Sequence, residues 1–342
     1  MWYYIFMKII KLDENKNPYL PDREMMRCLK RQVKCVSEYP AIDNSALHSE
    51  IGKVFNINAE NVHFGNGTME IFEKLVKVFG DVKYGFLIPT FWGFKYYLGL
   101  NSFDNFIEIE YSADESENFA NLEKLASECD VIYLCNTNNP NLHYFEKDSL
   151  LKVIQTHPNC HFVIDETLLA YEDFYAKSIY LSCTAVSNLS VVLSPSKIFG
   201  VAGVRAGILF SNKAIIEKAN KLHSPFVTTR ITQGFIIHQM KRFNSLDGIK
   251  KKIYDNYKLL ETGLCKKQIK RIDNRNSCFV NVVLDDSVDI EDLKQYLSSH
   301  NIIVRYSSEL VFATEKFLRV SAGTRRDYLT LIKYFNKYFE NN

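Results

Sequence analysis

Short apolar runs alternate with amphipathic stretches over the first two thirds of this 342-residue chain. Each run is almost entirely apolar, as in strands that are buried on both faces, and the stretches between the runs have helical spacing. This order predicts an α/β fold with a mostly parallel sheet covered on both faces. The expected strands are 84–88, 106–109, 131–135, 161–165, 189–194 and 204–210, and the clearest helices between them are 69–79, 122–129 and 147–155.

The pattern changes after about residue 225, and Pro225 marks the expected junction. Two longer helical stretches come first, followed by strands and helices that predict a second, smaller α+β domain. We therefore expect an N-terminal arm or part of the small domain at 1–30, a large domain at 31–225, and linking helices with the small domain at 226–342. The expected elements of the last part are helices 228–244, 246–270 and 290–300, strands 278–284, 302–306 and 317–321, and a final helix from about 324.

The composition excludes several classes of partner. Charged residues make up 24% of the chain and the net charge is +2, so no field for binding nucleic acid is expected. No apolar segment is long enough to span a bilayer. The apolar start, 1–10, lacks a basic leader and a cleavage site, which is typical of a packed arm, and Met7 is an alternative start. The eight cysteines form no C-x-x-C pair, which predicts reduced thiols and a cytoplasmic protein.

Polar residues follow two of the expected strands. Asp165 closes the strand 161–165, and the turn at Asn139 and Pro140 follows the strand 131–135. The carboxyl ends of parallel strands form one edge, where ligands of such sheets bind. A carboxylate at the end of an apolar strand needs a cation or strong hydrogen bonds. The alternatives are a helix N-cap or a solvated strand end for Asp165 and a plain turn at Asn139. No metal site is expected, because Pro158 breaks the helical presentation of nearby His and Cys side chains.

The segment Ser194–Arg205 suggests covalent chemistry. It places Lys197 between hydroxyl groups and an arginine, eight residues further on, in a glycine-rich turn. A lysine amine condenses with an aldehyde, while hydroxyls and a guanidinium hold a phosphate, and these are the needs of pyridoxal 5'-phosphate. The alternative is an ordinary loop lysine. The helix that opens at 67–69 offers backbone N–H groups to the same phosphate, or is a plain Thr-capped helix.

Several motifs in one order resemble those of fold-type I pyridoxal-phosphate aminotransferases, and within them the histidinol-phosphate aminotransferase group. The resemblance covers nearly the whole chain and implies a three-layer fold with a mostly parallel seven-stranded sheet. The related threonine-phosphate decarboxylases share it. The motifs are Asp-Glu-Asn-Lys-Asn-Pro-Tyr at 13–19, Tyr-Pro at 39–40, Gly-Asn-Gly-Thr-Met-Glu at 65–70, Pro-Thr-Phe at 89–91, Asn-Asn-Pro at 138–140, Asp-Glu at 165–166, the Lys197 segment, Ile-Ile-Val-Arg at 302–305 and Leu-Arg-Val-Ser-Ala-Gly at 318–323.

The resemblance implies a role for each matching residue. Lys197 carries the Schiff base and shuttles a proton, and Asp165 pairs with the pyridine nitrogen. Tyr39 reaches the phosphate from the neighbouring subunit of a homodimer, while Arg319 and Arg305 bind the carboxylate and the distal anion of the substrate with help from Tyr19. The expected cofactor ligands are Tyr39, Gly67, Thr68, Met69, Phe91 (with Trp92 as a rival for the stacking role), Asn139, Asp165, Ser194, Ser196, Lys197 and Arg205.

Two departures from the family pattern leave alternatives open. The family usually reads Asp-Glu-Ala-Tyr, where this chain has Leu168 in place of the tyrosine hydroxyl, and usually continues Asn-Pro with Thr-Gly, where this chain has Asn141 and Leu142. The loss of the hydroxyl is expected to raise the pKa of the Schiff base. The main hypothesis is ping-pong transamination of a small phosphorylated or otherwise anionic amine. The alternatives are decarboxylation of a phosphorylated amino acid and a catalytically silent relative.

Overall fold

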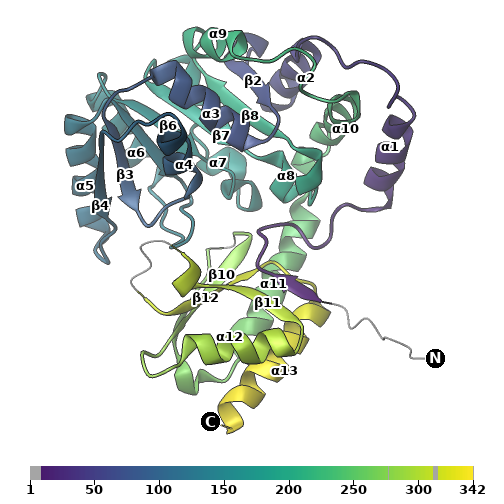
Figure 1. Ribbon diagram of the computed structural model, residues 1–342, viewed down its shortest axis with the longest axis vertical. Coiled ribbons are helices and arrows are strands. Elements are labelled where there is room, and N and C mark those ends of the chain that lie inside the picture. Colours follow the sequence, from purple (N-terminus) through teal and green to yellow (C-terminus); the bar gives the residue numbers. More distant parts are fainter. Residues whose placement is uncertain (1–8, 276, 311–314, 342) are drawn as a thin grey trace. The chain divides into compact units, whose positions relative to one another are not determined.

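The computed structural model describes residues 9–275, 277–310 and 315–341, and the chain divides into two compact units (Figure 1). The large unit is Leu20–Leu246, and the small unit is Met1–Tyr19 with Asp247–Asn342. These divisions differ from the expected boundaries at 30 and 225. Helices α1 (Arg23–Val33) and α10 (Arg230–Met240) pack against each other inside the large unit, so both flanking segments belong to it. The start 1–8, including Met7, lies outside the described residues.

A seven-stranded sheet forms the centre of the large unit, and only one of its strands runs against the others. The mostly parallel sheet expected from the sequence is therefore confirmed. The reversed strand is β8, which pairs antiparallel with both of its neighbours. In spatial order the strands are β2 (Val62–Gly65), β8 (Gly207–Ser211), β7 (Leu189–Leu193), β6 (His161–Asp165), β5 (Val131–Cys135), β3 (Tyr84–Ile88) and β4 (Phe106–Glu110).

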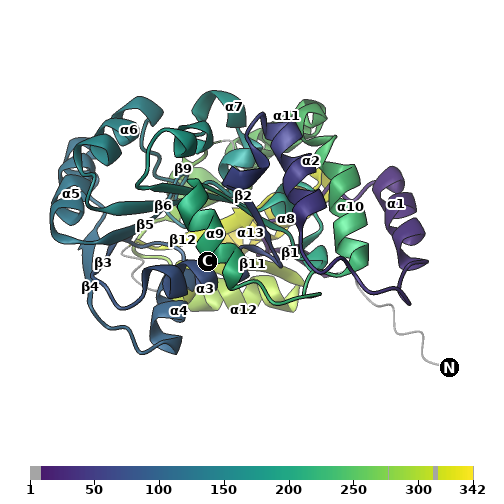
Figure 2. The ribbon, with the colours of Figure 1, turned by 90° about the horizontal axis from the view of Figure 1, so that it is seen from above.

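Helices cover both faces of this sheet (Figure 2), which explains why its inner strands are apolar on both sides. On one face lie α3 (Thr68–Phe79), α4 (Gly93–Leu100) and α9 (Lys213–Lys221), and on the other α5 (Glu115–Glu128) and α6 (Lys147–Thr156). The rings of Phe72, Phe94 and Tyr133 meet between α3, α4 and the sheet. The remaining α-helices of the unit are α2 (Ser45–Phe55), which contacts α10, and the short α7 (Phe174–Lys177) and α8 (Pro195–Ile198).

The small unit has a five-stranded sheet in which β1 (Ile10–Leu12) adds to the edge, parallel to β11 (Ile302–Tyr306). The other strands pair antiparallel, in the order β11, β12 (Phe317–Ser321), β10 (Phe279–Leu284) and β9 (Ile269–Asp273). Helices α12 (Ile290–Ser299) and α13 (Arg325–Asn341) pack together, and α13 also contacts α11 (Asp247–Gly263).

The predicted helix 246–270 is wrong at its end. Helix α11 stops at Gly263, and β9 begins at Ile269. This strand lies at the edge of the sheet and is partly exposed, so it carries lysine and arginine instead of an apolar run. Its two isoleucines stand three positions apart, a spacing that also fits the inner face of a helix.

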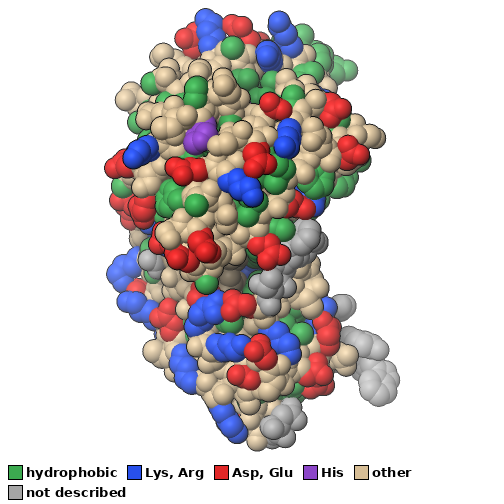
Figure 3. All heavy atoms as spheres, turned by 90° about the vertical axis from the view of Figure 1, so that its left-hand side faces the viewer, with side chains coloured by type: hydrophobic (Ala, Val, Ile, Leu, Met, Phe, Trp, Pro, Cys, Tyr) green, Lys and Arg blue, Asp and Glu red, His purple; other side chains and the backbone are tan. Residues whose placement is uncertain are grey.

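Among the described residues no helix combines the length and the apolar character needed to cross a membrane. The face in Figure 3 shows acidic and basic side chains interspersed with apolar ones, which agrees with the small net charge.

Asn188 connects the start of β7 to the segment that precedes β6. It stands just before β7, and its Nδ2 donates to the carbonyl oxygens of Ile154, His157 and Cys160 at 2.9, 3.0 and 2.9 Å. Ile154 lies in the last turn of α6, and His157 and Cys160 belong to the turn that leads from α6 into β6. One buried amide therefore fixes the starts of both strands.

We expect Asn188→Ala to lower the free energy of unfolding of the protein by about 1–3 kcal/mol, because three hydrogen bonds to carbonyl oxygens are lost in a buried site. Urea denaturation followed by fluorescence measures the change. The matched control is Asn121→Ala, which removes one long 3.5 Å bond on α5 and should change stability by less than about 0.5 kcal/mol. Equal effects of the two substitutions would contradict the role of Asn188.

Candidate active site

The register of the large sheet brings the ends of six strands to one edge. The carboxyl ends of β2, β3, β5, β6 and β7 lie there together with the start of the reversed strand β8. This follows from the paired positions Gly65 with Gly207, Leu193 with Ile208, Asp165 with Val192 and Cys135 with Asp165. The segments that carry the predicted cofactor ligands Gly67, Thr68, Met69, Phe91, Asn139, Asp165, Ser194, Ser196, Lys197 and Arg205 all leave or enter the sheet at this edge.

Asp165 is a buried acid at the centre of the edge. Only 8% of its surface is exposed, and burial raises the pKa of its carboxyl from 3.8 to about 6, against the lowering effect of hydrogen bonds from Thr167 and of the Lys197 charge. The N–H of Thr167 donates to Oδ1 at 2.9 Å. A carboxylate with so few protein donors in a site closed to water gains from a cationic ligand.

The segment that carries Lys197 is held on three sides. Its backbone turns through the single helical turn α8, and the carbonyl oxygen of Lys197 accepts a bond of 2.8 Å from the hydroxyl of the buried Tyr171. The Ser196 hydroxyl accepts from the N–H of Ala206 at 3.0 Å and lies 3.2 Å from its carbonyl oxygen. The Ser194 hydroxyl lies 3.4 Å from the same oxygen. The two serines therefore tie the lysine segment to the start of β8.

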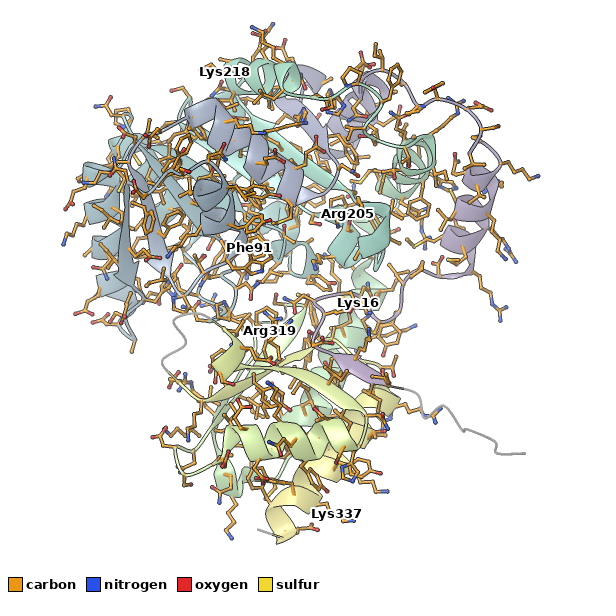
Figure 4. All side chains as sticks on the ribbon, viewed as in Figure 1. Lys16, Phe91, Arg205, Lys218, Arg319 and Lys337 are labelled. Carbon is orange, nitrogen blue, oxygen red and sulfur yellow. The ribbon has the colours of Figure 1, made fainter. Side chains whose placement is uncertain are left out.

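Arg205 and Gly67 form the other side of this corner. Arg205 has a left-handed backbone, with a φ of 59°, and its Nη1 donates to the carbonyl oxygen of Ala202 at 3.0 Å. A Cβ built on Gly67 would lie 2.3 Å from Arg205 Nη2, so only glycine allows the guanidinium to lie against the start of α3. Gly67 makes no side-chain cap, which leaves the first N–H groups of α3, at Thr68 and Met69, directed at the same corner. Figure 4 labels Arg205 beside α8.

A buried polar network stands behind the start of α3, and the sequence did not reveal it. Glu70 accepts from the N–H of Asn66 and pairs with Lys74 at 2.5 Å. Lys74 Nζ also lies 3.1 Å from His63 Nε2 and 3.0 Å from His223 Nδ1. Burial lowers the pKa of both histidines, so their neutral rings can accept from the lysine. The network fixes the loop that carries Gly67.

The two neighbouring asparagines after β5 have different roles. Asn138 is fully buried and organises the turn: its Nδ2 donates to Pro89 O at 2.8 Å and to Asn141 Oδ1 at 2.7 Å. Its Oδ1 accepts from the Thr90 hydroxyl at 3.1 Å. Asn139 keeps part of its surface exposed at the edge. The turn therefore uses Asn138 as its structural support and presents Asn139.

The departure from the family pattern after Asn139 has a visible consequence. Leu142 takes the position where the family usually has glycine, and its backbone is left-handed, with a φ of 61°. That conformation costs a leucine roughly 1–2 kcal/mol. The side chain is buried, with 3% exposure, and its N–H donates to Asn138 O at 3.1 Å. Burial and hydrogen bonding therefore offset the strain, and the turn is kept without glycine.

Of the two aromatic candidates for stacking, Phe91 is the one built into the fold. Its ring lies 5.6 Å from that of Phe94 and 6.1 Å from that of Phe72, at the border of the core. A Cβ on Gly93 would lie 2.4 Å from the Phe91 ring, so that glycine makes room for it at the start of α4. Trp92 is 59% exposed.

Two further predicted positions differ in exposure. Tyr39, between α1 and α2, is 83% exposed, and its ring contacts that of Phe226 at 5.5 Å. Leu168 is buried, with 6% exposure, directly after the Asp165 segment. The structure thus keeps Tyr39 on the surface and Leu168 as an apolar group inside.

The substrate-binding residues predicted from the sequence lie in the small unit. Arg305 on β11 and Arg319 on β12 are direct cross-strand partners. Arg319 is 7% exposed, lies 5.2 Å over the ring of Phe279, and donates from Nη2 to Asp13 O at 3.2 Å. Burial lowers the pKa of its guanidinium to about 10, so it stays charged at neutral pH. Arg305 is more exposed and lies 3.5 Å from Glu309.

Tyr19 is oriented inside the same unit. Its hydroxyl oxygen accepts from Asn256 Nδ2 at 2.6 Å, and the amide also donates to Gly323 O at 3.0 Å. Lys252 Nζ lies 5.9 Å from the centre of the Tyr19 ring. The bond from Asn256 uses the oxygen of the Tyr19 hydroxyl as an acceptor. The hydroxyl proton can therefore be donated to another group.

Comparison with known proteins agrees with this geometry. The family model for aminotransferase class I and II matches residues 7–335. The chain belongs to that family. A histidinol-phosphate aminotransferase from Caldanaerobacter subterraneus subsp. tengcongensis is 27% identical over 330 residues, covering 93% of this chain and 90% of that protein.

Two solved structures share the fold. The histidinol-phosphate aminotransferase from Sinorhizobium meliloti, in complex with pyridoxal-5'-phosphate, has a TM-score of 0.86 at 16% identity and covers 98% of this chain and 92% of its own. The L-threonine-O-3-phosphate decarboxylase from Porphyromonas gingivalis has a TM-score of 0.80 at 19% identity, with coverages of 96% and 99%. The chain thus has the fold of these enzymes.

The residues at the large sheet edge fit this cofactor. The corner where a Cβ on Gly67 would meet Arg205 brings the first N–H groups of α3 to a guanidinium, and both kinds of group bind phosphate. The buried Asp165 has the charge that would suit a protonated pyridine nitrogen, and Lys197, beyond the adjoining strand end, has the amine that would bind the aldehyde.

We expect Asp165→Asn to stabilise the cofactor-free protein at pH 8 by about 3 kcal/mol. The folded carboxyl has a pKa of about 6 against an ordinary 3.8, so its charge costs folding free energy above pH 6. The cost shrinks as the pH falls from 6 to 3.8 and is absent below. Urea denaturation at pH 8 and pH 5 should show a gain that is roughly halved at the lower pH.

The matched control is the exposed Asp104, whose substitution Asp104→Asn should leave the pH dependence of stability unchanged. A pH-independent effect of Asp165→Asn would show that the carboxyl is not held away from water as described.

Proposed function

We propose that this enzyme transfers an amino group to or from a small amine that carries a phosphate or another distal anion, as in histidinol phosphate. The observation that carries the proposal is the pair Arg305 and Arg319 on neighbouring strands. Like charges directly opposite each other in a sheet are destabilising unless an anion lies near both. The named relative and one of the two solved structures are histidinol-phosphate aminotransferases.

In this proposal the large unit holds the cofactor. The N–H groups of Thr68 and Met69, the hydroxyls of Ser194 and Ser196 and the guanidinium of Arg205 bind its phosphate. Asp165 keeps its ring nitrogen protonated, Asn139 donates to its phenolic oxygen, and Phe91 stacks on its ring. When bound, the cofactor carries the amino group and accepts electrons from the substrate Cα.

Lys197 has two successive tasks in this proposal. Its amine first holds the cofactor and is then displaced by the amine of the substrate. The released Nζ would take the proton from the substrate Cα and return it to the cofactor carbon that carried the aldehyde, as general base and then acid. Arg319 holds the carboxylate of an amino-acid substrate such as glutamate, while Arg305 and the donor hydroxyl of Tyr19 hold the distal anion.

We further propose a homodimer in the cytoplasm. The 83% exposure of Tyr39 supports a role in which its hydroxyl reaches the cofactor phosphate of a second copy. The eight cysteines form no disulfide, which is typical of a reducing compartment.

The first test labels the lysine. After incubation with pyridoxal phosphate and reduction with borohydride, peptide mass spectrometry should find the pyridoxyl group on Lys197. The exposed Lys218 and Lys337, both labelled in Figure 4, serve as internal controls. A label spread evenly over surface lysines, or none at all, would sink the proposal and favour a catalytically silent relative.

The second test separates transamination from decarboxylation. With glutamate alone, the absorbance of the bound cofactor should change to that of its amine form in a single turnover, with release of a keto acid. Release of carbon dioxide from phosphoserine or phosphothreonine, without formation of a keto acid, would show that the enzyme is a decarboxylase and not a transaminase.

We expect Arg305→Gln to raise KM for a phosphorylated amine roughly 10- to 100-fold, because a hydrogen bond to a charged group is lost. The KM for an amine without a distal anion should change less than about threefold. Arg319→Gln should weaken the binding of every substrate that has an α-carboxylate, and so raise its KM. Steady-state kinetics measures both.

The control for this pair is Arg271→Gln. Arg271 is an exposed arginine of the same sheet, paired with Asp273 at 3.0 Å and with Glu315. Its loss should leave both KM values unchanged. If Arg305→Gln affects the two classes of amine equally, Arg305 does not read the distal anion.

A further inference from the structure

Thr167 connects the two halves of the proposed cofactor site. Its N–H donates to Asp165 Oδ1 at 2.9 Å, and its hydroxyl oxygen accepts from the N–H of Ser194 at 3.1 Å. One residue thus contacts both the acid at the end of β6 and the segment that leads from β7 to Lys197. No motif in the sequence singled it out.

The direction of these bonds determines where the Thr167 proton points. Because the hydroxyl oxygen already accepts from Ser194, its proton must be donated elsewhere. The Asp165 carboxylate is the acceptor beside it, and the hydroxyl lowers the pKa of that carboxyl against the effect of burial. Thr167 and Asp165 are each 8% exposed, so water cannot easily replace the bond.

We infer that Thr167 is a positioning residue, which aims the Asp165 carboxylate at the cofactor ring nitrogen and couples it to the Lys197 segment. This rests on the proposed function of Asp165 and Lys197. With two donors from Thr167, the carboxylate is held in one orientation and stays ionised, and its remaining acceptor capacity is left for the ring nitrogen.

The charge on Asp165 also affects the pKa of the nitrogen that would link Lys197 to the cofactor. An ionised Asp165 keeps the ring nitrogen positive, and a positive ring disfavours a second proton on the nitrogen that links Lys197 to the cofactor. Leu168 acts in the opposite direction, because it cannot donate to the phenolic oxygen. The hydroxyl at 167 therefore partly compensates for the one missing at 168. The other titratable groups that face Asp165 are Cys135 on β5 and Glu166, next in the chain.

The test follows the absorbance of the bound cofactor in the holoenzyme as a function of pH. Thr167→Val keeps the shape and removes the hydroxyl, so the midpoint of the absorbance change should rise by about half a pH unit or more. The dissociation constant of pyridoxal phosphate should rise roughly tenfold. Thr167→Ser keeps the hydroxyl. It should restore the midpoint of the absorbance change to that of the wild type, and the dissociation constant to within about a factor of two of the wild-type constant.

The matched control is Ser190→Ala, which removes a buried hydroxyl from β7 that bonds to Ser211 at 2.8 Å and touches neither Asp165 nor Lys197. It should change neither value. Thr167→Ala, with the residue that the family usually has there, replaces the valine variant if that variant does not fold.

The outcomes are distinct. If borohydride labels Lys197 in the variants while the midpoint and the dissociation constant equal those of the wild type, the inference is overturned and the proposed function stands. Equal shifts in Thr167→Val and Ser190→Ala would also overturn it, since any buried hydroxyl would then have the same effect. If the wild type takes no label, the proposed function fails first and the inference with it.

Discussion

The structure of the large unit depends on keeping one carboxylate out of water. Asp165 ends a strand whose residues are almost all buried, and burial alone raises the pKa of its carboxyl toward neutrality. The fold meets this cost only in part, with the donors of Thr167 and the charge of Lys197. A buried acid of this kind lowers the stability of the protein, and a cationic ligand, such as the ring nitrogen of the proposed cofactor, would offset the loss.

The sequence predicted the sheet well where burial is complete on both faces. The bounds of β3, β5 and β6 were predicted to the residue, because an unbroken apolar run has no other stable place. The strand β2 was missed, because His63 interrupts its apolar pattern, and the edge strand β9 was taken for a helix. In both strands, polar side chains are supported by partners that lie far away in the chain.

The same limit applies to the site. The motifs located the segments that carry Lys197, Asp165 and Arg205, because glycine and hydroxyl residues beside a strand end have few other uses. They could not show that Asn138 is the structural support and Asn139 the presented group, since the two residues are identical and adjacent. That difference comes from Pro89 and Asn141, whose oxygens accept from the side chain of Asn138. Thr167 escaped notice for a similar reason, because its partner Ser194 stands 27 positions away.

The network behind the phosphate corner shows how the fold orders a loop without a ligand. Lys74 is 4% exposed, its charge is paired with Glu70, and it also donates to two imidazoles that burial keeps neutral. Breaking one partner of such a set leaves a buried charge uncompensated, so the set holds one arrangement. Because Glu70 also accepts from the N–H of Asn66, this order reaches Gly67 and the first turn of α3. The N–H groups of the proposed phosphate site are therefore ordered by the protein itself, and less ordering entropy would be lost on cofactor binding.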